Sequence, residues 1–552
     1  MSLIDGAFDG WRAFLLLLLS VAFASTQAEA GCAPYPVALR AGNVSLSNGK
    51  VARGVEMAVG EPEQKFAFMP LFDRQSILLY SSETLQEGKR SKDGLVSFRG
   101  GSYDPIASKT RKASTLNTSL GDPEEPEVSS IADRMKLNDN VTLDDIEMGI
   151  AASDWDTQGY KPLMGFGLGT NSTLLRLLRA SDRIASRSWG FFWGFGFGMP
   201  SQLDGSFVFG GYDRAKVTGE RFTAKLTPNQ PDCSTQLVVE VSDLTLNFPN
   251  GTGVSIFPRF KPRPVLRMCI APYVPVLMSL PLLPYFDSWL RQTRQNLNMM
   301  EGGLGYYFWN QKYHQEHNAY DGGLTITLSS GLKISFSNEK LVVPYVEVDR
   351  QTGDTTTNTT TPVLLVTSLQ GSSSSAMPYL GSQFLSAAYL QVNQDAGQFS
   401  LWKANPTTNE DLVAMDAADA EVPEFCTAAP GATAPGGTSP GDTHPTAPGG
   451  TFPGGTHPES DNGSLSKGAI AGLVVGAVAC VAIFGGLAMW LLKRNEPTAA
   501  AKAPGQSTSA FDGKQDLNQQ GTVPPVYENG SAEHHTAPVI YELGHESRSE
   551  LP

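Results

Sequence analysis

The sequence is poor in histidine, cysteine and positive charge. It has 7 histidines and 5 cysteines in 552 residues, and 41 basic against 55 acidic residues give a formal net charge of −14. Nucleic acid is therefore not an expected partner, because phosphate binding requires a basic surface. The histidines show no metal-ligand spacing, so we expect no metal and no cofactor. Hydrophobic residues make up 41% of the chain, which is enough to bury a large core.

Two long apolar runs predict that the chain is exported and anchored in a membrane. Residues 1–30 are typical of a signal peptide, with Arg12 before the apolar run and small residues before Gly31. Residues 468–492 form an uncharged run long enough to span a bilayer, and basic residues follow it directly. We expect a single-pass type I protein of the plasma membrane or a secretory-pathway membrane, with residues 31–467 outside and 493–552 in the cytosol.

The segments on both sides of the predicted transmembrane helix are polar. Residues 407–467 are rich in Pro, Gly and Thr, which predicts an extended, O-glycosylated stalk. The tail, 493–552, is predicted to be disordered and contains Pro524-Pro525-Val526-Tyr527, the form that WW domains bind. Glycines at 468, 472 and 476 would line one helix face, which predicts either a homodimer through this helix or only the usual abundance of glycine in such spans.

Sequons and cysteines agree with export. The Asn-x-Ser/Thr sequons outside the membrane predict N-glycosylation at Asn43, Asn117, Asn140, Asn171, Asn250, Asn358 and Asn462. Four cysteines lie outside, and spacing alone permits three pairings of Cys32, Cys233, Cys269 and Cys426.

Hydrophobic periodicity predicts a mainly β domain. Alternating apolar and polar residues predict strands in 35–59, 233–254 and 302–348. Leucines at helical spacing predict a short helix within 171–184, and 285–297 has the pattern of an amphipathic helix. The Thr-rich segment 351–361 is predicted to be a polar loop.

The chain has two halves that echo one another around the segment DGSFVFGGYDRAKVTG, residues 204–219. An apolar run ends in glycine at 165–169, and another does so at 379–381. The central segment resembles the interlobe segment of pepsin-like aspartic proteases, and the whole of 35–405 is most similar to membrane-anchored members from filamentous fungi. The resemblance implies a two-lobed pepsin-like fold with an N-terminal lobe at 31–203 and the interlobe segment and C-terminal lobe at 204–406. It also implies that the domain ends meet, which favours pairing Cys32 with Cys426 and Cys233 with Cys269.

The residues that match the catalytic motifs of this family are incomplete. Asp73-Arg74-Gln75-Ser76 stands where the family has Asp-Thr-Gly-Ser, so the acid and the serine remain. In the second half, Cys269-Ile270 is followed by Ala271 or Pro272, depending on a one-residue gap, where the family has its second Asp. No acidic residue lies between Asp243 and Asp287. Asp73 is then either a remnant of the first catalytic acid or a polar turn residue on a solvated loop.

Three functional hypotheses follow. The leading one is a catalytically inactive surface glycoprotein that binds a peptide or protein in the interlobe cleft, because peptide hydrolysis by this family needs two carboxylates. The second is an active aspartic endopeptidase that pairs Asp73 with another acid. The third is a surface sensor or structural glycoprotein that signals through its tail.

Overall fold

The computed structural model describes residues 32–83, 91–114, 128–151, 164–259, 264–303, 306–307, 310–369 and 376–426. Within these ranges no helix is both long and apolar enough to cross a membrane. The predicted signal peptide, transmembrane helix and tail, the sequons at Asn117 and Asn462, and the Pro524-Pro525-Val526-Tyr527 motif lie outside them.

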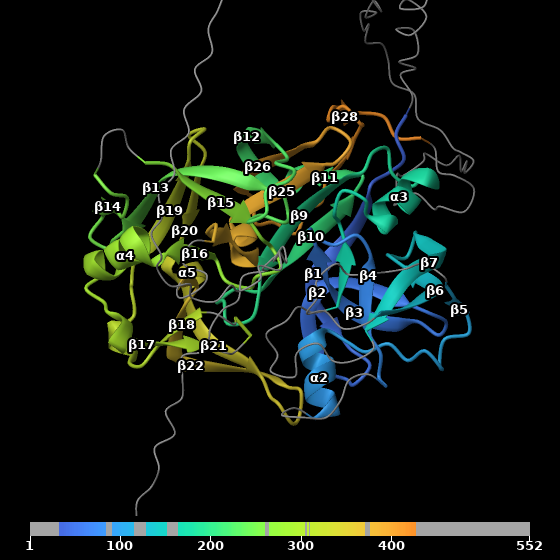
Figure 1. The fold of residues 1–552 in the computed structure, drawn as a ribbon, viewed down its shortest axis with the longest axis horizontal. Coiled ribbons are helices and arrows are strands. Elements are labelled where there is room, and N and C mark those ends of the chain that lie inside the picture. The colour runs from blue at the N-terminus through green and yellow to red at the C-terminus, as the bar shows by residue number, and fades with distance from the viewer. Residues whose placement is uncertain are drawn as a thin grey trace, which may run out of the picture. The chain divides into compact units, whose positions relative to one another are not determined.

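A large mixed β-sheet, with both antiparallel and parallel strand pairs, contains strands from both halves of the chain (Figure 1). Its order is β12-β26-β25-β9-β10-β1-β2-β3-β8-β4-β7-β6-β5. In chain order its strands are β1 (Val37–Ser45), β2 (Val51–Val59), β3 (Gln64–Leu71), β4 (Ile77–Tyr80), β5 (Lys112–Ala113), β6 (Val128–Lys136), β7 (Thr142–Ala151), β8 (Gly165–Gly167), β9 (Ser188–Phe195), β10 (Leu203–Phe209), β12 (Val217–Lys225), β25 (Ala388–Asn393) and β26 (Gln398–Ala404).

The remaining strands form three smaller sheets. One has the order β20-β19-β13-β15-β24-β16-β23, with β14 on β13; another has the order β17-β18-β22-β21, and the last β11-β27-β28. Their bounds are β11 (Gly211–Asp213), β13 (Val238–Asn247), β14 (Gly253–Ser255), β15 (Leu266–Ile270), β16 (Met278–Pro281), β17 (Met300–Gly303), β18 (Asn310–Tyr313), β19 (Gly323–Leu328), β20 (Lys333–Phe336), β21 (Val342–Val348), β22 (Thr355–Leu364), β23 (Val366–Leu369), β24 (Tyr379–Leu380), β27 (Leu412–Met415) and β28 (Glu421–Val422). The α-helices are short: α2 (Lys92–Arg99), α3 (Thr173–Ala180), α4 (Asp287–Gln292) and α5 (Asn338–Leu341).

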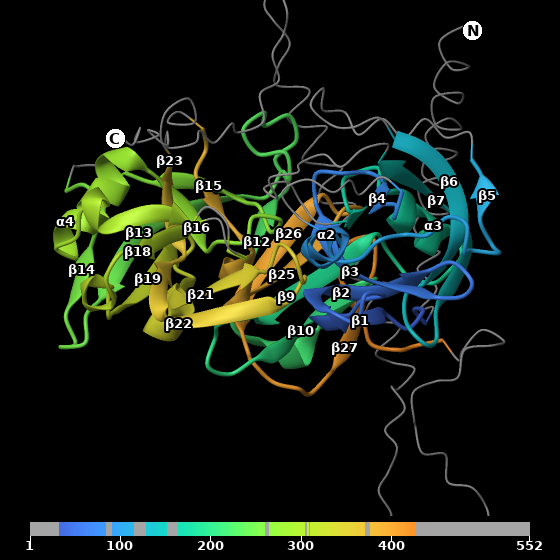
Figure 2. The same ribbon diagram turned by 90° about the horizontal axis from the view of Figure 1, so that it is seen from below.

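The two halves share the large sheet where β9 pairs with β25. Figures 1 and 2 show β25 and β26, from the second half, beside β9 and β10 from the first. The segment 204–219 supplies β10, β11 and the start of β12, so it carries the chain from one half to the other. The mainly β architecture predicted from periodicity is confirmed, and it is compatible with a two-lobed pepsin-like fold.

Three local predictions need correction. Residues 355–361 belong to β22 rather than to a loop, because threonine is β-branched and suits an extended strand paired with β21. The folded domain continues past residue 406, where composition placed the start of the stalk, since β27 pairs with β11 and all four of its residues are buried. Helix α2 was missed, although Ser91 caps it by accepting a hydrogen bond from the Gly94 N–H. Helix α3 confirms the prediction within 171–184, while α4 is shorter than predicted.

Disulfides join Cys32 to Cys426 and Cys233 to Cys269, as the resemblance implied. The first ties together the two ends of the described chain, beside a contact between the Tyr35 and Phe425 rings. The second lies within the second half, and both of its cysteines are buried. Disulfides of this kind indicate an extracellular or secretory-pathway protein.

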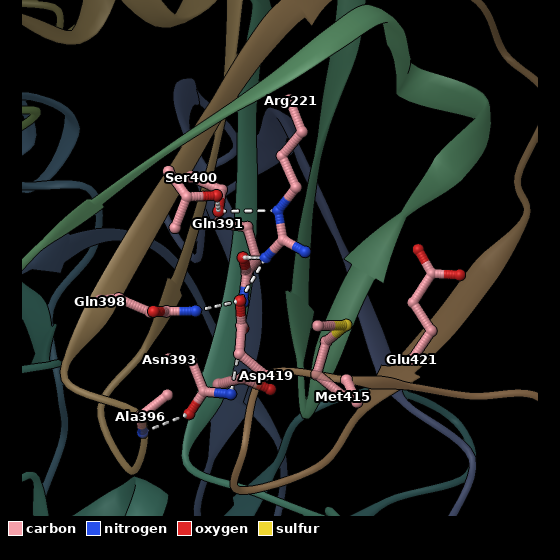
Figure 3. A network of polar contacts seen from close by, with 12 residues as sticks. Arg221, Gln391, Asn393, Ala396, Gln398, Ser400, Met415, Asp419 and Glu421 are labelled. Atoms are coloured by element: carbon pink, nitrogen blue, oxygen red, sulfur yellow. Dashed lines mark hydrogen bonds and ion pairs between the residues drawn. The ribbon is translucent and has the colours of Figure 1, made fainter.

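The C-terminal segment is held on the shared sheet by a buried carboxylate (Figure 3). Asp419 is 2% exposed and pairs with Arg221, whose guanidinium also bonds Gln391 Oε1 at 3.0 Å. Amide groups of Gln391, Asn393 and Gln398 donate to the same carboxylate at 2.9, 3.2 and 2.6 Å. Every donor comes from β12, β25 or β26, so this network joins residues 416–421 to strands of the shared sheet.

Candidate functional site

The same strand arrangement occurs once in each half of the molecule. In the first half, β8 lies between β3, to which it is parallel, and β4, to which it is antiparallel. In the second half, β24 lies between β15 and β16 with the same orientations. The outer pairs β4–β7 and β16–β23 are both parallel. The repeated apolar-glycine runs in the sequence therefore mark a structural repeat.

The strand registers leave two candidates, Ala271 and Pro272, for the position in the second half that is equivalent to Asp73. Leu71 pairs with Gly167, which lies two residues before Gly169. Cys269 pairs with Tyr379, which lies two residues before Gly381. Two residues beyond each paired position stand Asp73 and Ala271. Counted instead from the last paired residue of each ladder, Leu71 and Ile270, Pro272 stands opposite Asp73, and neither Ala271 nor Pro272 is an acid.

The Asp73 side chain lies between the two halves and is largely buried. It is 17% exposed, and its carboxylate accepts a hydrogen bond of 3.4 Å from the Ser234 hydroxyl of the second half. The Arg74 Nε atom lies 3.9 Å from the same carboxylate. Asp73 lies in a turn in which Gln75 is exposed, and this turn faces Ser234 of the other half of the molecule.

Ser234 and Tyr273, both from the second half, lie near Asp73. Tyr273, from the same loop as Ala271, interacts with the Ser234 hydroxyl, and burial together with the negative charge of Asp73 raises the pKa of this phenol. A phenol with a raised pKa stays neutral and offers a proton donor, not a base. Ala271 is 4% exposed and packs in an apolar cluster with Cys233 and Cys269.

A small pocket of about 40 Å³ opens beside Asp73. Residues of both halves line it, among them Phe72, Asp73, Thr170, Ser234, Gln236 and Gln394. Asp73 is the only acidic residue among the described residues that line this pocket. The pocket has room for one or a few water molecules and a single carboxylate to bind them.

Comparison with known proteins bears on this arrangement. No family model matches the chain. A stretch of 202 residues, 34% of the chain, is 26% identical to secreted aspartic protease 6 of Candida albicans and covers 45% of that protein. The chain resembles an aspartic protease. It spans less than half the length of this relative, so the relative's activity is not thereby assigned to it.

In this aspartic-protease-like protein, the loop Asp73-Arg74-Gln75-Ser76 corresponds to the first catalytic motif of the family and has room for Gln75. Gln75 stands where the family has glycine, and its Oε1 accepts a hydrogen bond of 2.7 Å from the Asn171 N–H. Side chains are absent at Gly167 and Gly169, where a Cβ would come within 2.6 Å or less of Gln75 atoms. Gly169 thus leaves room for the Gln75 side chain, and Gly167 leaves room for the backbone of residues 74–76. Ser76, the other conserved member of the motif, lies directly before β4 and is partly buried.

A second pocket of about 50 Å³ lies between the halves and is largely apolar. Its lining includes Met69, Trp193 and Phe197 from the first half and Tyr273, Pro275 and Tyr306 from the second. Val51 lies at its surface and is 37% exposed. The sequence gave no signal for this pocket, because its walls come from segments far apart along the chain.

The predicted modification sites differ in accessibility. Asn140, Asn171, Asn250 and Asn358 are exposed. Asn43 lies in β1, where its Nδ2 donates to Gln202 Oε1 at 3.0 Å and its Oδ1 is buried. Among the residues that the structure describes, no three His, Cys, Asp or Glu side chains are placed to hold a metal ion.

Proposed function

We propose that this aspartic-protease-like protein is catalytically inactive and binds a peptide or protein segment between its two halves. The observation that carries the proposal is that Ala271 or Pro272, and no acid, stands at the position equivalent to Asp73. Hydrolysis by an aspartic protease needs two carboxylates that share a proton and hold the attacking water between them. The side chains of Ala271 and Pro272 can neither accept a proton nor orient a water molecule, so Asp73 has no partner for the reaction in this loop.

The binding role is supported by the second pocket. An apolar pocket with a few polar groups suits an apolar side chain presented by an extended peptide. The pocket is lined by Trp193, Tyr306 and Met69, residue types that supply much of the contact energy at protein interfaces. Loss of the second acid leaves this pocket intact, since no wall of it is formed by Ala271.

Peptide binding can be tested with a library of fluorescent peptides and the purified ectodomain. Val51→Glu places a charge at the pocket surface, whereas Ile106→Glu makes the same change at a residue that is 82% exposed and lines neither pocket. We expect Val51→Glu to weaken peptide affinity at least about tenfold, a loss of about 1.4 kcal/mol. Ile106→Glu should bind as the wild type does. Equal affinities for both variants would rule out this pocket as the binding site.

The protein is further proposed to be a single-pass type I surface glycoprotein. The predicted signal peptide and transmembrane run support this topology, and the two disulfides indicate an oxidising compartment. In a eukaryotic host, the full chain should remain with membranes after alkaline extraction, and a chain that ends at residue 467 should appear in the medium. Alkaline release of the full chain would contradict membrane anchoring.

An active aspartic endopeptidase is the second candidate, favoured by the retention of Asp73 in a largely buried position. Such an enzyme would pair Asp73 with an acid outside the described residues. Calorimetric titration with a pepstatin-type inhibitor separates the candidates. One-to-one binding that disappears in Asp73→Asn would favour the endopeptidase, and absence of binding would favour the inactive protein.

A further inference from the structure

One edge of strand β22 is open over the segment Thr355–Asn358. Residues 355–358 pair with β21 on one side, and the pairing shifts register after Asn358. On the other side, β18 pairs with β22 only at Val363 and Leu364 among the described residues. Residues 356–360 are exposed, and β21 is the only described strand that pairs with residues 355–358. An exposed strand edge is a template for pairing with a second chain.

The usual protection of an edge by charge is absent from this strand. Residues 355–369 contain no charged side chain, and six of the seven residues from 355 to 361 are threonine. Asp354, directly before the strand, is paired with Lys50 at 2.8 Å. A neutral segment of high β propensity at an open edge is an aggregation hazard.

Asn358 is the last residue of the open segment Thr355–Asn358 and is placed for modification. It is exposed, and its Oδ1 accepts hydrogen bonds from the Thr360 N–H at 3.0 Å and the Thr360 hydroxyl at 2.8 Å. Its Nδ2, the atom that would carry a glycan, donates to no described residue. Asn250 shows the same arrangement with Thr252. Asn43 differs, because its Nδ2 is bonded to Gln202 and a glycan there would break that bond.

We infer that Asn358 carries an N-linked glycan that shields the open edge of β22 from pairing with a second copy of the chain. The inference rests on the proposed export, since N-glycosylation takes place in the secretory pathway. A bulky, hydrated glycan at Asn358, the last residue of the open edge, blocks the approach of another strand and does so without charge. The Asn43 sequon is left unmodified.

The test uses the full chain expressed in a eukaryotic secretory host. Site occupancy is measured by mass spectrometry after enzymatic deglycosylation, and self-association by sedimentation velocity in mild detergent. Asn358→Gln and Thr360→Ala each remove the sequon by a different change, and Thr360→Ser keeps it. Asn250→Gln removes a glycan that lies away from the β22 edge. Asn358→Lys removes the glycan but puts a charge on the edge.

We expect glycans at Asn358 and Asn250 and none at Asn43. Asn358→Gln and Thr360→Ala should associate several-fold more than the wild type, while Thr360→Ser, Asn250→Gln and Asn358→Lys should not. A bare Asn358 beside a modified Asn250 would overturn the inference and leave export standing. Equal association of Asn358→Gln and Asn250→Gln would overturn the shielding role. Absence of glycans from every sequon would contradict export itself and, with it, this inference.

Discussion

In two copies of one strand arrangement, Asp73 stands two residues beyond the Leu71–Gly167 pair and Ala271 stands two residues beyond the Cys269–Tyr379 pair. One copy keeps a carboxylate and the other has a methyl group. The carboxylate is held by Ser234 of the opposite half, so it is part of the packing between the halves. The proposal that the protein has an aspartic-protease-like fold without catalytic activity rests on these two positions.

The buried carboxylate of Asp419 should be important for stability. We expect Asp419→Asn to lower the free energy of unfolding by about 3 kcal/mol, because an amide NH₂ would face donors and Arg221 would lose its partner. Asparagine also suits the left-handed backbone at this residue, where φ is 66°. Chemical denaturation measures the change. Asp139→Asn, at a carboxylate that is 95% exposed, is the control and should change stability little.

The tip of the β21–β22 hairpin is attached to α2 through Ser91. The Ser91 N–H donates to Arg350 O at 2.8 Å, and its hydroxyl donates to Gln351 O at 2.5 Å. Because the same hydroxyl caps α2, Ser91→Ala should cost about 1–2 kcal/mol. Ser337→Ala, at the start of α5 where no side-chain cap bond is made, should cost much less. If Ser91→Ala and Ser337→Ala lose equal stability in thermal unfolding, the hydrogen bonds of Ser91 contribute nothing.

Asp213 should make stability depend on pH. It is 1% exposed, and burial raises the pKa of its carboxyl above the ordinary value, with the nearby Asp411 charge acting in the same direction. The folded state then holds this proton more tightly than the unfolded state, so the contribution to stability is full at low pH and is lost as pH rises through the raised pKa. Burial and Asp213 likewise raise the pKa of Glu410.

Asp213→Asn removes this titration and isolates its effect. The unfolding free energies of wild type and variant, measured in urea from about pH 3 to about pH 7, should diverge in favour of the variant as pH rises above about 4. The amide can still accept the hydrogen bonds from the Ala215 and Asp411 N–H groups. A difference that stays constant with pH would contradict the raised pKa.

Sequence patterns predicted the parts of this protein that depend on local chemistry. The glycine turns at 165–169 and 379–381 and the joining segment 204–219 were found, because tight turns and strand ends need particular residues nearby. Strand β22 was missed, because a run of threonines is polar by composition while its branched side chains favour extended backbone. The strands after residue 406 were missed because they are short and lie next to the Pro- and Gly-rich segment beyond Cys426, whose composition is typical of an extended stalk.

The site could be predicted only in part. Asp73 and the absence of a second acid were predicted from motifs, and the pairing of β15 with β24 leaves both Ala271 and Pro272 as counterparts of Asp73. The contact of Asp73 with Ser234 joins residues 161 apart in the chain, and no local pattern marks it. The apolar pocket likewise depends on how the two halves pack.

The rate of peptide-bond cleavage by the purified ectodomain tests the central claim most directly. Wild type and Asp73→Asn are incubated at acid pH with denatured protein, and new amino termini are counted over time. With one carboxylate where the reaction needs two, both should release termini no faster than buffer alone. Cleavage by the wild type that Asp73→Asn abolishes would contradict the account.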